Sequence, residues 1–241
     1  HTVDEDASEL TGVVTPAPNN ITLKVYYKRN LHTITWIDEA GTTTQDVYFG
    51  ATIVAPTAAE KVGYSFSEWR LLEETMPDYD CIFEAYYTAN NYPVVFYMDA
   101  EKTEVVAELN LEYGSALSSA SFTVPTKTGY SLLGWAYEGT ETVLNLANET
   151  VPVGGVTLVG IWEIQSYTVN FRGNNGTYSD GTNNKAVSFV YGNEVTAPEI
   201  PARVGYTFAG WMDNATKVVY GVGETLPVMT NAVVNYLAQW T

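Results

Sequence analysis

Few residues in this chain have side chains suited to catalysis. There are two histidines, His1 and His32, and one cysteine, Cys81. A Ser-His-Asp or Cys-His site needs an imidazole base. His1 is the first residue, and His32 occupies a position at which two later repeats of the same pattern have tyrosine. Cys81 begins the apolar run Cys81-Ile82-Phe83, which is typical of a buried cysteine. The sequence therefore predicts no nucleophilic catalysis.

The sequence also lacks the residues that usually bind metals and cofactors. Zinc sites need histidine or cysteine ligands, and neither phosphate-binding glycine motif precedes a helix pattern. The acidic cluster Asp4, Glu5 and Asp6 does not match a calcium loop, which favours a solvated segment. The number of acidic residues alone does not exclude a pair of carboxylates for glycoside cleavage, but these residues are scattered along the sequence. We predict that the chain is not an enzyme and binds no cofactor or metal.

The charge balance bears on the partners of the chain. Acidic residues outnumber basic ones 28 to 11, for a formal charge of −17. Nucleic acids and anionic membrane surfaces attract basic faces, so both are unfavoured as partners. No run of 18 apolar residues suggests a membrane span, and the single cysteine excludes an intramolecular disulfide. We expect any signal peptide or wall anchor to lie outside these 241 residues.

One seven-residue pattern occurs three times and organises the chain. Its copies are Gly63 to Trp69, Gly129 to Trp135 and Gly205 to Trp211. Apolar residues alternate with small or polar ones after an initial glycine, which predicts a half-buried strand entered through a turn. The repetition favours three small modules over one large domain.

Other alternating segments recur around this pattern. A first strand has inward residues at His32, Ile34, Trp36; Tyr92, Val94, Phe96; and Tyr167, Val169, Phe171. A second strand ends at the pairs Phe49-Gly50, Tyr113-Gly114 and Tyr191-Gly192. A last strand has inward residues at Phe83, Ala85, Tyr87; Leu158, Gly160, Trp162; and Tyr236, Ala238, Trp240. The segment 21–29 matches only this last strand.

The connection between the second strand and the repeated pattern is nearly constant in length. It takes 13, 15 and 13 residues from glycine to glycine, with an apolar residue at Ile53, Leu117 and Val195. The sequence after Pro56 is compatible with one short helical turn at 57–61. The other loops vary in length, as expected of tolerant hairpin tips around one compact core.

Three further expectations concern side chains. We expect the repeated tryptophans Trp69, Trp135 and Trp211 in the core, packed on Phe49, Tyr113 and Tyr191. Lys61, Lys127 and Arg203 each lie two residues before the repeated glycine. A ligand contact is one interpretation, but we favour a stem packed over the following tyrosine ring, with the charged end near a local acid or carbonyl. Tyr48, Tyr86, Tyr97 and Leu237 are predicted on the opposite face, where they either contact a ligand or cover a module surface.

Together these features resemble the internalin-type B repeat, also called the Listeria–Bacteroides repeat, from about residue 21 onward. The third copy matches best, from Tyr167 through Arg203-x-Gly205-Tyr206 to Tyr236-Leu237-Ala238-Gln239-Trp240. Departures are Glu68 in place of glycine, Leu132 in place of phenylalanine and Tyr87 in place of the final tryptophan. The resemblance implies β-grasp-like modules of about four strands with a short crossover, used in tandem on secreted or wall-attached bacterial proteins and without enzymatic activity.

We therefore expect a mainly β (α+β) chain of three such modules. The predicted ranges are a linker at 1–20, the last strand of a truncated preceding repeat at 21–29, and repeat modules at 30–90, 91–164 and 165–241. The predicted function is a non-catalytic stalk or spacer of an extracellular, cell-surface or cell-wall protein that takes part in adhesion or protein binding. Its partner would be a host or neighbouring-cell surface protein, or a glycan. The alternative is a carbohydrate-binding accessory module of a larger secreted enzyme.

Overall fold

The computed structural model describes residues 1–8, 24–230 and 232–241. Contacts divide the chain into two compact units, residues 1–92, 110–115 and 150–155 in the first and 93–109, 116–149 and 156–241 in the second. Nearly all regular structure in the described residues is strand, and the exception is one 3-10 helix at Leu117–Ser119. The prediction of a mainly β chain built from several small sheets is confirmed.

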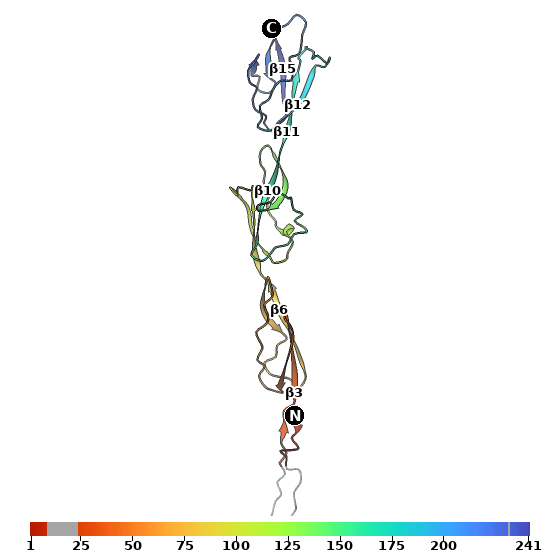
Figure 1. Cartoon of the computed structure of the whole chain (residues 1–241), viewed down its shortest axis with the longest axis vertical. Helices are drawn as coiled ribbons and strands as arrows, with labels where there is room; N and C mark the ends of the chain where they lie inside the picture. Colours follow the sequence, from red (N-terminus) through yellow and green to blue (C-terminus); the bar gives the residue numbers. More distant parts are fainter. Residues whose placement is uncertain (9–23, 231) are drawn as a thin grey trace, which may run out of the picture. The chain divides into compact units, whose positions relative to one another are not determined.

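The first four-stranded sheet contains β3 (Leu31–Asp38), β4 (Gly41–Tyr48), β5 (Tyr64–Arg70) and β6 (Cys81–Ala89). Its strand order is β4-β3-β6-β5. The central pair, β3 and β6, is parallel, with Trp36 opposite Phe83, and both outer pairs are antiparallel. Figure 1 shows the labelled strands β3 and β6 within this part of the chain.

The second sheet repeats this arrangement. Its strands are β7 (Asn91–Tyr97), β8 (Val105–Glu112), β9 (Tyr130–Tyr137) and β10 (Val156–Ile164), in the order β8-β7-β10-β9. The central pair is again parallel, with Phe96 opposite Leu158. A β-bulge opposite Ile161 and Trp162 skips Leu133, as a bulge in the first sheet skips Ser67.

The third sheet has the same order with one added strand. It contains β11 (Ser166–Arg172), β12 (Asn184–Val190), β13 (Phe208–Asp213), β14 (Val219–Gly221) and β15 (Val234–Trp240), in the order β12-β11-β15-β13-β14. Phe171 lies opposite Tyr236 in the parallel central pair. Figure 1 labels β11, β12 and β15, which are coloured from green through cyan to blue.

Many of the inward positions predicted by alternation form the core of each sheet. Fully buried pairs on the first strands are Ile34 and Trp36, Val94 and Phe96, and Val169 and Phe171. The crossover residues Ile53, Leu117 and Val195 are buried too. Alternation succeeds here because each sheet buries one face, and successive side chains of a strand point to opposite faces.

The repeated tryptophans are buried as predicted, but their predicted packing partners are wrong. Trp69, Trp135 and Trp211 pack edge-on against the first-strand aromatics Trp36, Phe96 and Phe171, with ring centroids 4.8, 4.9 and 5.1 Å apart. Phe49, Tyr113 and Tyr191 lie elsewhere because the chain turns at the glycine that follows each of them. These glycines have φ of +74°, +76° and +81°.

The helical turn expected at 57–61 is also wrong, since these residues adopt no helix. Polar groups at the end of the first sheet bind the backbone of this segment. The N–H of Ala59 donates to the Asp38 carboxylate at 2.8 Å, and the Tyr87 hydroxyl donates to the carbonyl of Ala59 at 2.7 Å. Both backbone groups of Ala59 are thus engaged outside the segment. The short helix lies instead in the crossover before β9.

A small two-stranded sheet precedes the first repeat. It pairs β1 (Thr2–Val3) with β2 (Tyr27–Lys28) and carries a salt bridge from Lys28 to Asp4 at 3.2 Å. Two residues of the predicted linker are therefore in a strand, held by the end of the predicted orphan strand. Residues 9–23 lie outside the described chain. The boundaries of the linker, the orphan strand and the modules at 30–90, 91–164 and 165–241 stay predictions.

Candidate interaction surfaces

A basic side chain lies over a tyrosine ring at the start of every repeated pattern, as predicted. The Lys61 nitrogen is 5.1 Å from the centre of the Tyr64 ring, and the Lys127 nitrogen is 4.9 Å from that of Tyr130. The guanidinium of Arg203 lies 3.7 Å from the Tyr206 ring centre. These distances are in the range of cation–π attraction. Since all three pairs have the same spacing, they are a structural feature of the repeat.

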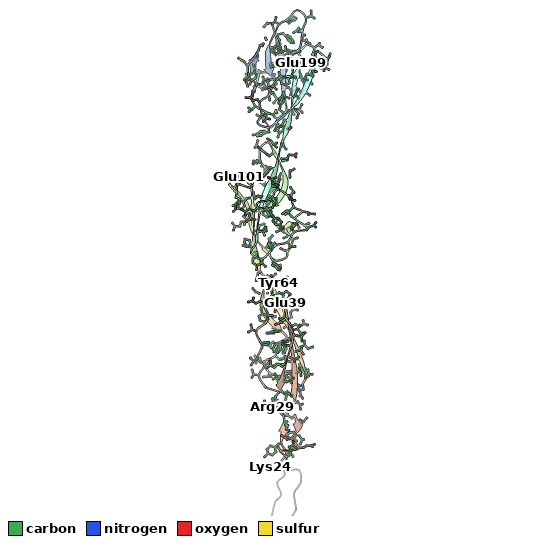
Figure 2. The ribbon with its side chains drawn as sticks, viewed as in Figure 1. Lys24, Arg29, Glu39, Tyr64, Glu101 and Glu199 are labelled. Atoms are coloured by element: carbon green, nitrogen blue, oxygen red, sulfur yellow. The ribbon has the colours of Figure 1, made fainter. Side chains whose placement is uncertain are left out.

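Nearby carboxylates hold two of these basic groups. Lys61 forms a salt bridge with Glu39 at 3.1 Å, and Lys127 approaches Asp99 at 3.9 Å. Hydrogen bonding to Glu39 and its negative charge raise the pKa of Lys61, which stays protonated. Figure 2 labels Glu39 and Tyr64 close to one another in the first repeat. The ammonium group is therefore shared between a ring and an acid, which favours a structural role for this side chain.

Within the first compact unit, the repeated glycine at 63 contacts an aromatic ring distant in sequence. A Cβ at Gly63 would lie 2.3 Å from the ring of Tyr113. Tyr113 also meets Tyr64 edge-on at 5.6 Å. The backbone closes the same contact, because the N–H of Asn90 donates to Gly63 and the N–H of Tyr113 donates to Asn90, at 2.9 and 2.8 Å. We call this combination of glycine, ring and backbone bonds the glycine–aromatic joint.

The second compact unit contains an equivalent joint. A Cβ at Gly129 would lie 2.2 Å from the ring of Tyr191. The N–H of Gln165 donates to Gly129, and the N–H of Tyr191 donates to Gln165, both at 2.8 Å. Tyr191, like Tyr113, is the aromatic residue of an aromatic-Gly pair. In both cases this residue belongs to a joint with the preceding repeat. This is the position that sequence reasoning assigned to the tryptophan core.

The outer face of the first sheet carries the most distinctive group of exposed side chains. We define the outer patch as Arg70, Leu71, Ile82 and Tyr86, on and beside β5 and β6. The Arg70 guanidinium lies 4.0 Å from the Tyr86 ring centre. Leu71 is 87% exposed and has a φ of +60°, while Ile82 is 62% exposed. Glu68 and Glu84 border a hollow lined also by Arg70, Leu71 and Ile82.

The outer patch is specific to the first repeat. At the Ile82 position the later repeats have Thr157 and Asn235, and at the Tyr86 position they have Ile161 and Gln239. Arg70 corresponds to Ala136 and Met212. Exposed apolar side chains beside a stacked arginine and tyrosine are more typical of an interaction surface than of a feature that the shared fold requires.

Glu68, the departure from glycine, is explained by the neighbouring loop. At Gly210 a Cβ would lie 2.2 Å from the carbonyl oxygen of Tyr220 on β14, and at Gly134 it would lie 2.6 Å from Val143. Both glycines also have positive φ, +143° and +150°. In the first repeat the corresponding loop is short, and β5 is the last strand of its sheet in the described residues. Position 68 therefore accepts a side chain.

The structure does not bring the predicted outward residues together. Tyr86 belongs to the outer patch, whereas Tyr48 is exposed on β4, with β3 between their strands. Tyr97 is half-buried on β7, with the Lys102 nitrogen 5.9 Å from its ring centre. Leu237 is half-buried on β15. Only Tyr86 therefore joins a group of side chains with a shared exposed face.

The two candidate chemical residues of the first repeat have structural surroundings. His32 Nε2 is 2.8 Å from the Asp78 carboxylate, which also accepts a hydrogen bond from Asn30 at 2.9 Å. These bonds, from Asn30 first and then His32, lower the pKa of Asp78. Cys81 is buried, as predicted, and burial raises the pKa of its thiol. A raised pKa disfavours the reactive thiolate.

One hollow in the third repeat is lined by two glutamates, the residue type that glycoside cleavage uses in pairs. Glu194 and Glu224 line it together with Phe208 and Trp211. The Glu224 carboxylate already accepts the N–H of Gly221 at 2.6 Å. This hydrogen bond holds the turn after β14, which is a structural role for the Glu224 carboxylate.

Sequence reasoning missed a second repeated motif, Glu-Thr-x-Pro. It occurs at Glu74–Pro77, Glu149–Pro152 and Glu224–Pro227. Its third residues, Met76, Val151 and Leu226, are buried. The carbonyls of Met76 and Val151 accept the N–H groups of Gly50 and Gly114 at 2.8 and 3.0 Å, while in the third repeat Met229 accepts that of Gly192 at 2.8 Å. The same Glu-Thr-x-Pro pattern in three loops of different length was the sequence signal that could have revealed this motif.

Two searches of the described residues concern metals and membranes. No group of three or more histidine, cysteine, aspartate or glutamate side chains among them is placed to hold a metal ion. In the same part of the chain, no helix has the length and apolar character needed to cross a membrane.

The model of the Listeria-Bacteroides repeat domain matches the chain three times, at residues 32–91, 92–160 and 167–234. The chain belongs to the Listeria-Bacteroides repeat family. These matches fall on the three sheets described above, and each includes one Gly-Tyr-to-Trp pattern. Membership therefore explains why the basic residue, the glycine and the buried tryptophan recur together.

Other proteins with similar sequences have longer chains. A protein of Evansella cellulosilytica named as a membrane protein is 28% identical over 92% of this chain and 33% of its own length. A Gly-rich protein of the same organism, also named as a membrane protein, is 28% identical over 79% of this chain and 22% of its own. Internalin H of Listeria monocytogenes is 32% identical over 52% and 21%. The Listeria-Bacteroides repeats described here thus span a third or less of these relatives.

Proposed function

We propose that this chain is a non-catalytic repeat region of a bacterial cell-surface or secreted protein, acting as a stalk or spacer and in adhesion through protein binding. The observation that carries the spacer role is the glycine–aromatic joint, which recurs at Gly63 and Gly129 with the same backbone bonds. A repeat joined in this way extends a chain without requiring any new type of contact.

We infer further that each repeat is a β-grasp-like module. The supporting observation is the strand order, in which the two central strands are the first and last of each repeat and run parallel. The second and third strands then lie on either side of this central pair, joined by the long crossover. The extracellular location, at the cell surface or wall, is proposed because of the similarity to Internalin H and to relatives named as membrane proteins.

The outer patch supports protein binding as the adhesive activity. Leu71 and Ile82 offer apolar area, and Arg70 stacked on Tyr86 offers an oriented cation. Arginine and tyrosine are the residue types that contribute most at protein interfaces. Because the patch is absent from the second and third repeats, adhesion is assigned to the first repeat and spacing to all three.

A carbohydrate-binding accessory role is the second candidate, and the exposed Tyr86 ring favours it. Aromatic faces stack on sugar rings, but the Arg70 guanidinium already lies over this ring at 4.0 Å. A sugar would therefore have to use the opposite face of the ring or displace Arg70. Protein binding needs no such rearrangement, because the stacked pair is then part of the docking surface.

The test compares adhesion with sugar binding on the full chain. Beads coated with the chain are measured for attachment to host and neighbouring bacterial cells, and the same chain is applied to a glycan array. We expect attachment that Arg70→Ala and Ile82→Asp reduce by more than about tenfold, since buried interface anchors carry most binding energy. Tyr48→Ala is the matched control, because Tyr48 is 56% exposed on the same sheet and lies outside the patch.

Treatment of the cells separates the two candidate functions. Attachment that survives glycosidase treatment and is lost after protease treatment supports protein binding. Micromolar binding to a glycan that Tyr86→Ala or Tyr97→Ala abolishes would contradict protein adhesion and support the carbohydrate-binding role.

A further inference from the structure

The third copy of the repeated glycine, Gly205, has the backbone of a joint without its aromatic ring. Its φ of +79° equals the +80° of Gly63 and Gly129 within one degree. Apart from Gly205 itself and its two chain neighbours, no heavy atom of the described residues lies within 4 Å of the position that a Cβ at 205 would take. Positive φ alone favours glycine here, so the open space above the residue is the informative observation.

The side chains beside Gly205 are exposed as a consequence. Tyr206 is 51% exposed, whereas Tyr64 and Tyr130, which meet a joint ring, are half-buried. Arg203 lies over Tyr206 just as Lys61 and Lys127 lie over their tyrosines. Arg203, Gly205 and Tyr206 thus have the arrangement seen in the two joints, although no ring of the described residues packs on Gly205.

We propose that Gly205 and Tyr206 form a docking surface for the aromatic-Gly corner of a further repeat placed in series after Trp240. The corner would supply a tyrosine or phenylalanine ring at the position that Tyr113 and Tyr191 occupy in the two joints. The occupant is chosen on geometry, since the same surface is filled in this way twice, with Asn90 and Gln165 donating to the glycine carbonyl. These donors follow the last inward aromatic residues, Tyr87 and Trp162, by three positions.

The inference depends on the joints alone and stands whether or not the chain is an adhesin. An aromatic ring packed on glycine with two backbone hydrogen bonds is a small contact. Such a contact can hold two successive repeats of one chain together, because the short link between them gives the second repeat a high effective concentration near the first. A separate copy of the chain would lack this advantage.

The test uses the full chain lengthened by repeating residues 163–241 directly after Trp240. In this chain the copied Gln165 amide should donate to the Gly205 carbonyl and become protected from hydrogen exchange. Gly205→Val should speed exchange of that amide by about tenfold or more, because opening of the joint then precedes exchange. Gly223→Val is the matched control, since Gly223 has a φ of +83° and equally open space but takes no part in a joint.

A second variant protects the test against a folding defect at position 205. Replacing the copied Tyr191 by alanine leaves Gly205 unchanged and should speed the same exchange to a similar extent. Equal exchange in the lengthened chain, Gly205→Val and Gly223→Val would overturn the proposal. Concentration-dependent association of the original 241-residue chain that Gly205→Val abolishes would also overturn it, because the surface would then accept a second copy.

Discussion

The ring of Tyr191 lies against the α-carbon of Gly129, so that a Cβ at position 129 would stand 2.2 Å from ring carbons. The two residues are far apart in sequence, yet the repeat pattern contains both in every copy. Gly129 therefore meets two requirements at once, a φ of +80° and the absence of a side chain. The first requirement is local, and the second depends on the joint.

These two requirements can be separated by substitution. Gly129→Ala should lower the free energy of unfolding by about 2–5 kcal/mol, the sum of left-handed strain and overpacking. Gly192→Ala should cost only about 1–2 kcal/mol, because its φ of +81° is the same but the space around it is open. Urea denaturation of both variants measures the difference. Equal costs would show that the ring moves aside freely, and Tyr191→Ala added to Gly129→Ala should recover the excess.

The sequence allowed prediction of the strands and their buried positions. Ile34 and Trp36 were assigned inward from alternation alone, and the stacking of Arg203 on Tyr206 was predicted from their spacing. Both follow from local geometry, since side chains two apart on a strand share a face. The partner of Trp211 was not predictable in this way. Phe171 and Tyr191 both lie far before Trp211 in the sequence, and alternation does not indicate which of the two rings packs on it.

The candidate surfaces were less predictable because they depend on register and on loops. Arg70 approaches Tyr86 diagonally across β5 and β6, because the register places Arg70 opposite Glu84 and Tyr86 opposite Glu68. Met76 lies in a loop of variable length without alternation, so its burial left no periodic signal. Contacts that depend on strand register and the burial of loop residues both require knowledge of the tertiary structure.

Trp211 is expected to be essential to the third repeat. Trp211→Ala should cost about 3–5 kcal/mol, because it removes a buried ring packed on Phe171 and Phe208. Tyr206→Ala, at an exposed ring in the same repeat, serves as control and should cost far less. Thermal unfolding followed by circular dichroism measures both. A Trp211→Ala chain that melts like the wild type but loses a ligand would identify a surface binding residue instead.

The Glu-Thr-x-Pro motif gives a prediction for the first repeat. Met76 is 1% exposed. Its N–H donates a hydrogen bond to the Ala51 carbonyl, and its carbonyl accepts one from the N–H of Gly50. Met76→Ala should destabilise the chain by about 2–5 kcal/mol through the lost contacts and the cavity. Val54→Ala is the control, because Val54 is largely exposed in the same repeat. Similar denaturation midpoints for the two variants would contradict a core role for the loop.

Cys81 should be inert toward thiol reagents in the folded chain. Its side chain is buried among the core residues of the first sheet, and burial raises the pKa of the thiol. We expect slow reaction with an aromatic disulfide reagent under native conditions and fast reaction in urea, where the thiol is exposed. Fast native labelling at neutral pH would show that β6 opens readily or that the thiol is activated.

Alkaline pH should destabilise the third repeat through Tyr236. Burial is the first cause that raises the pKa of Tyr236 from 10.0 to about 12, followed by the negative charge of Asp213. The unfolded state therefore loses the phenolic proton at lower pH than the folded state. Stability from this group is fully present below pH 10 and is lost as the pH rises toward about 12. Urea denaturation across this range should show a falling midpoint, and Tyr236→Phe should make the fall shallower. Tyr206→Phe is the control, because the Tyr206 ring lies in the same repeat but is 51% exposed and outside the core. A fall of unchanged slope in Tyr236→Phe would assign the alkaline loss to other groups.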